Sequence, residues 1–338
     1  PKSTAITGIR AATTSGRDLS ALVVALRKAG KLKPMTQNVS AEDTRLLIAN
    51  VRKRGNPALG ERIYRRQALA CFACHAIGGV GPKVGPDLVS IGASAPIDYL
   101  IDSLIAPNKK IKEGFHLTVV KASGGKVAAG LELSADKHKV VLREASGSIL
   151  EIPAKEILSK KISPTSLMPA GLTASLTQEE FIHLVSFLSQ LGKEGPYRFP
   201  KQTFVRSVEI PLSQTTKKIK GANDFLTLPS EGTTKLQALV NGTLPLSEIP
   251  TSAGGNRYLR FRIQAEEDDE VRFTLSQEKG LRIQRTREKV KVSPQSKMVK
   301  HSVKPGTHIY ILTVTPQFPD KDISLEFHTM SPKLRLLN

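Results

Sequence analysis

The sequence has 338 residues, of which 39% are hydrophobic, enough for two or three domains with buried cores. Aromatic residues make up only 5%, and the absence of any run of about 18 apolar residues excludes a membrane-spanning helix. The net charge is +20, but the basic stretches are not interleaved with aromatic residues, so we expect no nucleic-acid groove.

Residues 1–54 are predicted to be helical. One helix is expected over residues 19–29, and a second begins at the capping-box pattern of Ser40 and Asp43. The run from 52 to 57, which is basic and ends in Gly-Asn-Pro, is expected to break the second helix. Two short helices bury little apolar surface, so we expect this segment to be the tail of a larger helical domain or a cap on the next one.

Residues 71–75, Cys71-Phe72-Ala73-Cys74-His75, contain both cysteines of the chain and follow a helix predicted from Pro57 up to this motif. The spacing C-x-x-C-H is the one that attaches a c-type haem. Two cysteines one turn apart can each add to a vinyl group, and the following histidine can place a ring nitrogen under the iron. We therefore expect one covalently attached haem c, held by Cys71, Cys74 and His75.

Three other interpretations of this motif fit less well. A thioredoxin-like pair opens a long helix in a βαβ unit, whereas a Gly/Pro-rich run over residues 78–86 follows here. A zinc site needs one more ligand than Cys71, Cys74 and His75 supply, and there is no second cysteine pair. The third alternative is a chance occurrence of the spacing.

A small β insert is expected after the haem motif, at about residues 112–160. A helix over 97–105, closed by a proline, comes first. The apolar period then changes to that of four short strands, with hairpin turns at 123–125 and 145–147.

The chain has four methionines that could fill the second axial position of a haem iron. Met168 lies in a proline-bounded loop just before the last helix of this region, which begins behind Thr177 as N-cap. A loop in that position can fold over the open face of the haem, so we expect Met168 to be the sixth ligand. The other three methionines lie in less suitable segments, which are Met35, Met298 and Met330.

Two histidines are the alternatives to Met168. His116 begins the β insert and His183 lies on an amphipathic helix. We therefore expect His116 to be a strand side chain and His183 a surface or interface residue, and neither to be an iron ligand. On the other face of the haem, the carbonyl of Pro86 is expected to accept the free N–H of His75 and to orient its ring.

Residues 198–338 are expected to form an all-β sandwich. Short strands with regular turn signals are characteristic of that architecture. The clearest strand patterns cover residues 258–263, 271–275, 308–314 and 323–327. No ligand constellation stands out in this region, although contact with a carbohydrate or a cell surface is an open expectation.

The positive charge lies mostly outside the expected haem core. Residues 55–107 and 167–200 together carry six basic and seven acidic side chains, so the excess belongs to the rest of the chain. A basic shell around a nearly neutral core suits docking on an acidic partner. We expect that partner to be a redox protein.

Several of these motifs together resemble the haem-binding domain found in planctomycete and verrucomicrobial proteins, over about residues 57–195. The matching residues are Gly60-x-x-Ile63-Tyr64, Cys71-x-x-Cys74-His75, Gly85-Pro86-Asp87-Leu88, Tyr99-Leu100-x-x-Ser103-x-x-x-Pro107-Asn108-x-x-Ile111 and Ser166-Leu167-Met168-Pro169. The resemblance implies a class I cytochrome c core with His75 and Met168 as axial ligands. It also implies that the helical segment is a remnant of a helical repeat, and no dehydrogenase domain accompanies it here.

The expected architecture is therefore a multidomain α+β chain. Helices occupy residues 1–54, a cytochrome c domain with its β insert occupies 55–197, and the sandwich occupies 198–338. The chain opens without a methionine or an apolar signal stretch, and covalent haem attachment occurs outside the bacterial cytoplasm, so we expect a processed, exported, periplasmic protein.

The function expected from the sequence is electron transfer without bond-making chemistry, so the chain is not expected to be an enzyme. One alternative is an adaptor that binds carbohydrate or a surface through its terminal sandwich. The other is a haem sensor or haem enzyme with an open or displaceable axial ligand.

Overall fold

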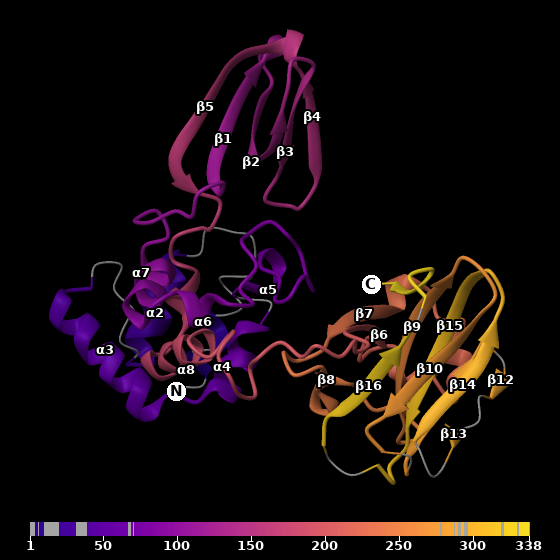
Figure 1. The fold of residues 1–338 in the computed structure, drawn as a ribbon. Coiled ribbons are helices and arrows are strands. Elements are labelled where there is room, and N and C mark those ends of the chain that lie inside the picture. Colours follow the sequence, from indigo (N-terminus) through magenta and orange to yellow (C-terminus); the bar gives the residue numbers. More distant parts are fainter. Residues whose placement is uncertain are drawn as a thin grey trace. The chain divides into compact units, whose positions relative to one another are not determined.

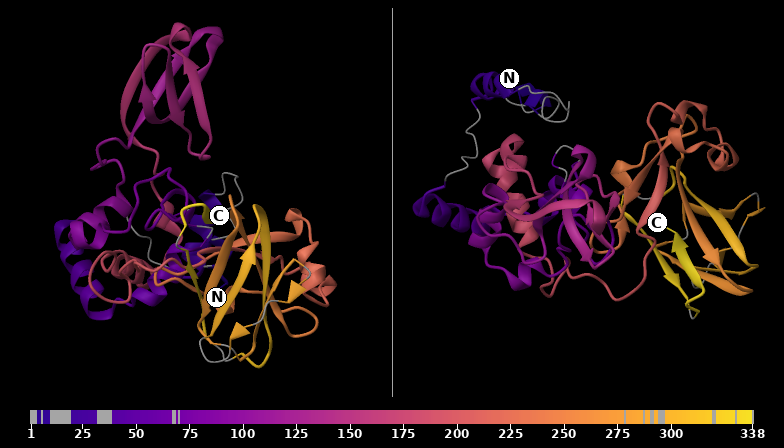
Figure 2. Two further views of the ribbon diagram at one scale, coloured as in Figure 1. Left: turned by 45° about the vertical axis from the view of Figure 1, so that its right-hand side comes forward. Right: turned by 90° about the horizontal axis from the view of Figure 1, so that it is seen from above.

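The computed structural model describes residues 4–5, 7–9, 20–31, 39–66, 69, 71–277, 279–286, 288–289, 292–293, 297–318, 321–329 and 331–337. It is a mixed α+β protein with several helices in its N-terminal half and three antiparallel sheets, two of them in the C-terminal part. The chain divides into two compact units, Pro1–Phe199 and Pro200–Asn338 (Figures 1 and 2). Among the described residues, no helix is both long and apolar enough to cross a membrane.

Three helices of the first unit, α3, α4 and α8, begin behind residues whose side chains cap them. Their bounds are α2 Ser20–Ala29, α3 Ala41–Arg54, α4 Pro57–Tyr64, α5 Cys71–Cys74, α6 Ile91–Ser94, α7 Ile97–Ile105 and α8 Gln178–Leu188. The Ser40 hydroxyl accepts the N–H of Asp43 at 3.0 Å, and the Thr177 hydroxyl accepts the N–H of Glu180 at 3.2 Å. Both predicted caps are confirmed, and Asn56 caps α4 in the same way.

Two predicted helix ends differ from the structure. Helix α3 includes the basic residues 52–54 and ends at Arg54, with Gly55 as its C-cap, because positive side chains in a last turn interact favourably with the helix dipole. Helix α4 ends at Tyr64 and does not continue to the cysteines, which form the separate turn α5. The Tyr64 hydroxyl, at the end of α4, donates to the carbonyl of His75 at 3.0 Å.

Helices α4 and α8 pack against each other through a glycine. A Cβ atom added at Gly60 would lie 2.0 Å from the carbonyl oxygen of His183 and 2.6 Å from Cβ of Phe187. No residue larger than glycine fits this crossing without moving a backbone. Phe187 and its neighbours Leu184 and Val185 are fully buried in the core beneath it.

The β insert between α7 and α8 is a five-stranded antiparallel sheet with the order β4-β3-β2-β1-β5. Its strands are β1 His116–Ala122, β2 Val127–Ala135, β3 Lys139–Arg143, β4 Ile149–Pro153 and β5 Ile157–Ser166. Figure 1 shows β5 and β4 as its two outer strands. A small apolar core around Val120 and Leu142 lies on one face, and the turns at 123–125 and 145–147 are where the sequence places them.

The prediction of four strands in the insert is wrong, because β5 is a fifth. Its sequence, ILSKKISPTS, carries two lysines and a proline in place of a regular apolar alternation. Such residues are tolerated on an edge strand, which has one unpaired side. The sheet therefore continues to Ser166, two residues before Met168.

The second unit contains two antiparallel sheets that share one core. The smaller sheet has the order β13-β14-β10-β16-β8, and the larger has β12-β11-β15-β9-β6-β7 with β17 beside β9. Phe261 of the larger sheet contacts Phe273 of the smaller, with their ring centroids 5.4 Å apart. The strand bounds are β6 Ser207–Pro211, β7 Thr233–Gln237, β8 Thr243–Leu244, β9 Arg257–Ala265, β10 Asp269–Leu275, β11 Leu281–Arg285, β12 Glu288–Lys289, β13 Val292–Ser293, β14 Met298–Val303, β15 Gly306–Val314, β16 Ile323–His328 and β17 Leu334–Leu337.

The four strand patterns found in the sequence lie in β9, β10, β15 and β16. The unit is not all β, however, because the short helix α9 (Ala222–Leu226) packs on the larger sheet. Phe225 of α9 is fully buried against Tyr258 and Ile311. The buried guanidinium of Arg260 donates to three carbonyls at the end of α9, so the helix is tied to the sheet by hydrogen bonds as well as by apolar contact.

Candidate functional site

The cysteine motif forms a single helical turn whose side chains share one cavity. The N–H of His75 donates to the carbonyl of Cys71 at 2.9 Å, which closes the turn. Cys71, Cys74 and His75 all line a cavity of about 370 Å³. That volume lies within the range of ligand-binding pockets.

The His75 ring is held in one orientation by its own surroundings. Its Nδ1 lies 2.8 Å from the carbonyl oxygen of Pro86. Because a carbonyl only accepts hydrogen bonds, Nδ1 carries the proton and Nε2 keeps a free electron pair. The contact between Pro86 and His75 is the one expected from the sequence.

The loop that carries Pro86 is held together by hydrogen bonds to one carboxylate. Asp87 accepts the N–H groups of Gly78, Gly79 and Val89 at 3.0, 2.6 and 2.8 Å. The N–H of Gly85 also donates to the carbonyl of Cys74 at 2.7 Å. The loop is thereby fixed against the turn that presents the histidine.

Burial keeps the side chains of the motif uncharged. It raises the pKa of the Cys71 thiol to about 12 and also raises the pKa of Cys74. It lowers the pKa of His75, although the hydrogen bond to Pro86 and the charge of Asp87 oppose this change. A thioredoxin-type nucleophile requires a lowered thiol pKa, so this site has the opposite electrostatics.

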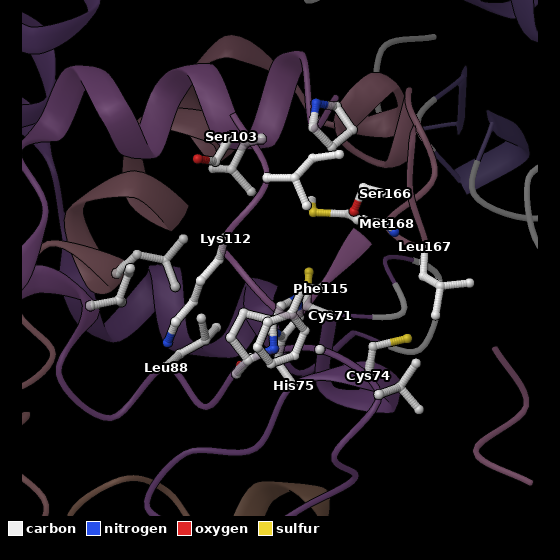
Figure 3. A pocket seen from close by; sticks show the side chains of 18 of the residues that line it. Cys71, Cys74, His75, Leu88, Ser103, Lys112, Phe115, Ser166, Leu167 and Met168 are labelled. Atoms are coloured by element: carbon white, nitrogen blue, oxygen red, sulfur yellow. Dashed lines mark hydrogen bonds between the residues drawn. The ribbon is translucent and has the colours of Figure 1, made fainter. Parts of the chain in front are cut away.

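Met168 lines the same cavity as the cysteine motif. In Figure 3 its thioether and the His75 ring are directed into the cavity from opposite sides of the view, with the two cysteine sulfurs between and beside them. The structure therefore brings together all five residues that the sequence singled out: Cys71, Cys74, His75, Pro86 and Met168.

Among the described residues, none of the alternative axial ligands lines this cavity. Met298 lies on β14 of the second unit, while Met35 and Met330 lie outside the described residues. His183 accepts the N–H of Asn56 through Nδ1 at 3.1 Å, so it joins α8 to the start of α4. His116 lies on β1, opposite Ser166.

Polar contacts around Met168 were not assigned from the sequence. The Ser166 hydroxyl accepts the N–H of Met168 at 3.0 Å, and the side-chain oxygen of Asn108 accepts the N–H of Ser166 at 2.8 Å. The Ser-x-Met spacing is a local signal, because serine hydroxyls often accept the N–H two residues on. The role of Asn108 is tertiary and has no local signal.

Two exposed lysines line the cavity beside aromatic rings. Lys110 Nζ lies 5.8 Å from the centroid of the Tyr99 ring, and Lys112 Nζ lies 5.8 Å from that of Phe115. The remaining lining is mostly apolar. The cavity therefore suits a large apolar ligand with negative groups at its edge.

A metal site made only of protein ligands does not fit. Over the ranges that the structure describes, there is no cluster of three or more His, Cys, Asp or Glu residues able to hold a metal ion. Cys71 and Cys74 are free thiols, and Cys71 donates to the carbonyl of Leu69 at 3.7 Å. No family model matches this chain, and no curated protein does either.

Proposed function

We propose that this chain is an exported monohaem c-type cytochrome that transfers electrons, with residues 55–197 as a class I cytochrome c domain. The observation that carries the proposal is the convergence of Cys71, Cys74, His75 and Met168 on one cavity of about 370 Å³. Two thiols, a ring nitrogen with a free electron pair and a thioether are the set that a covalently bound, six-coordinate haem requires.

Each residue has a distinct role in holding the group. Cys71 and Cys74 would form the thioether bonds, and His75 and Met168 would be the axial ligands. Bound there, haem supplies a one-electron couple at its iron. The hydrogen bond from His75 to Pro86 fixes the ring and makes its free nitrogen a stronger ligand.

The rest of the cavity has a mostly apolar lining, which suits a haem that transfers electrons. Apolar side chains such as Leu100 and Leu184, which are almost fully buried, exclude water from the lining. A low-polarity lining raises the reduction potential of a haem. Among the described residues that line the cavity, Lys110 and Lys112 are the cations that could meet the carboxylates of the haem.

The partner and the compartment follow from charge and chemistry. The net charge of +20 and the lysines beside the cavity favour a redox partner with an acidic docking surface. Because covalent haem attachment takes place outside the bacterial cytoplasm, the proposed location is the periplasm. The electrons would come from an exported dehydrogenase and pass to a further acceptor.

A pair of methionine variants tests the axial ligation. The Met168→Ala variant, made with a haem-maturation system, should lose the sulfur-to-iron charge-transfer band and bind carbon monoxide when reduced. Met298→Ala serves as the matched control, because Met298 lies on β14 of the second unit.

The outcomes separate electron transfer from sensing. The proposal expects the wild type and Met298→Ala to keep the band and to resist carbon monoxide. An unchanged Met168→Ala spectrum would contradict methionine ligation. Rapid carbon monoxide binding by the wild type would instead favour the haem sensor or enzyme.

A further inference from the structure

We propose that the β insert is a positioning frame that holds both loops carrying the axial ligands. The inference rests on the proposed haem site and concerns residues that would position the axial ligands without being ligands themselves. The insert contacts these loops through two residues: Ser166 contacts the loop that carries Met168, and Arg143 contacts the loop that orients His75.

On the Met168 side, the last strand of the insert leads directly into the loop that carries Met168. Strand β5 ends at Ser166, which pairs with His116 at the start of β1. The N–H of Ser166 donates to Asn108 at 2.8 Å, and its hydroxyl accepts the N–H of Met168 at 3.0 Å. The base of the Met168 loop is thus connected to the first strand of the insert at His116 and to Asn108, which precedes the insert.

On the His75 side, the insert reaches the loop that orients the imidazole. The guanidinium of Arg143, the last residue of β3, donates to the carbonyl of Lys83 at 2.7 Å. Val84 is buried, and a Cβ atom added at Gly147 of the following turn would lie 3.8 Å from its side chain. The next residues along this loop are Gly85 and Pro86.

The insert also forms part of the cavity wall between these two contacts. Leu131 of β2 and Ala145 of the β3–β4 turn line the cavity, and Leu131 pairs with Arg143 across the sheet. One sheet thus contacts the histidine loop, the cavity and the methionine loop. A sheet moves as a unit more readily than a loop does, so loosening either contact should free the ligand loop that it holds.

The Met168 side is tested by imidazole binding to the oxidised protein, because imidazole competes with Met168 for the iron. Ser166→Ala removes the acceptor for the Met168 N–H and should raise the apparent imidazole affinity about fivefold, the effect of one ordinary hydrogen bond. Ser166→Thr keeps a hydroxyl and should restore the wild-type affinity. Ser163→Ala is the matched control, since the hydrogen-bond partner of the Ser163 hydroxyl among the described residues is Thr165 on the same strand, at 2.6 Å.

The His75 side is tested by hydrogen exchange of the haem-loaded protein. Arg143→Gln should speed exchange of the Gly85 and Leu88 amides about tenfold, because a hydrogen bond from a charged donor is lost. Lys139→Gln is the matched control on the same strand, where Lys139 pairs with Glu151 at 2.8 Å.

The outcomes separate this inference from the proposed function. A wild type that carries no covalent haem contradicts the proposed function and the inference together. If haem is attached but Ser166→Ala or Arg143→Gln behaves like its control, the positioning role of the insert is contradicted while the proposed function stands. The corresponding contact then does not hold its loop. Both predicted changes, with both controls unaltered, support the positioning role.

Discussion

Substitution of Gly85 by alanine should disturb the candidate haem site although it leaves in place the four residues proposed to hold the haem. A Cβ atom at this position would lie 2.5 Å from Cε1, 2.7 Å from Nδ1 and 2.9 Å from Nε2 of His75. The imidazole therefore packs directly on the α-carbon of Gly85. The backbone cannot retreat easily, because the Gly85 N–H is bound to the carbonyl of Cys74 at 2.7 Å.

The size of the effect follows from how far the ring must move. Carbon atoms in contact are normally about 3.5–4.0 Å apart, so the His75 ring must shift by about 1 Å. Overpacking of this kind costs about 1–3 kcal/mol. A shift of that size also breaks the 2.8 Å bond to Pro86, which is worth about 1 kcal/mol more.

The assay combines thermal unfolding with the spectrum and reduction potential of the haem-loaded protein. Gly85→Ala should unfold at a lower temperature and show altered histidine ligation, with a shifted potential. Gly79→Ala is the control in the same loop: its φ of +75° makes alanine strained, but nothing lies within 4 Å of the added carbon. That strain costs roughly 1–2 kcal/mol without touching His75. If Gly79→Ala shifts the potential as much as Gly85→Ala, the packing argument for Gly85 is refuted.

Two further predictions concern the helix packing of the first unit and an ion pair of the second. Gly60→Ala forces α4 away from α8 and should lower the free energy of unfolding by about 1–3 kcal/mol in denaturant titrations; an unchanged midpoint would contradict the close crossing. Burial alone would raise the pKa of Glu209, but its hydrogen bonds to Arg262 and Arg260 outweigh burial and lower it below the ordinary 4.5. The stabilisation from this carboxylate is then present above the unfolded-state pKa and lost as the pH falls through the lower folded-state value. The difference in Tm between wild type and Glu209→Gln should therefore shrink on acidification, and a constant difference would contradict the ion pairs.

Local signals in the sequence predicted local structure well. The caps at Ser40 and Thr177 were found because a capping box depends on residues three positions apart. The hairpin turns of the insert were found from their glycines and serines in the same way. Strand β5 was missed because its lysines and proline hide the alternation on which a strand prediction depends.

In the candidate site, too, contacts that depend on local sequence could be predicted and contacts formed only by folding could not. The contact of His75 with the Pro86 carbonyl could be expected from the sequence, because the chemistry of a C-x-x-C-H motif restricts what surrounds it. The contacts of Gly85 with the His75 ring and of Arg143 with Lys83 join residues brought together only by folding. A single sequence contains no local pattern for such contacts, so the structure was needed to find them.

The covalent attachment of haem is the central claim and has a direct measurement. The full chain is produced with a haem-maturation system, denatured, and its pyridine haemochrome spectrum is recorded beside those of Cys71→Ala and Cys74→Ala. We expect the wild type to show the band of a haem with both vinyl groups saturated, and each cysteine variant to show the shifted band of a single thioether. A wild-type protein without any covalently retained haem would contradict the proposal.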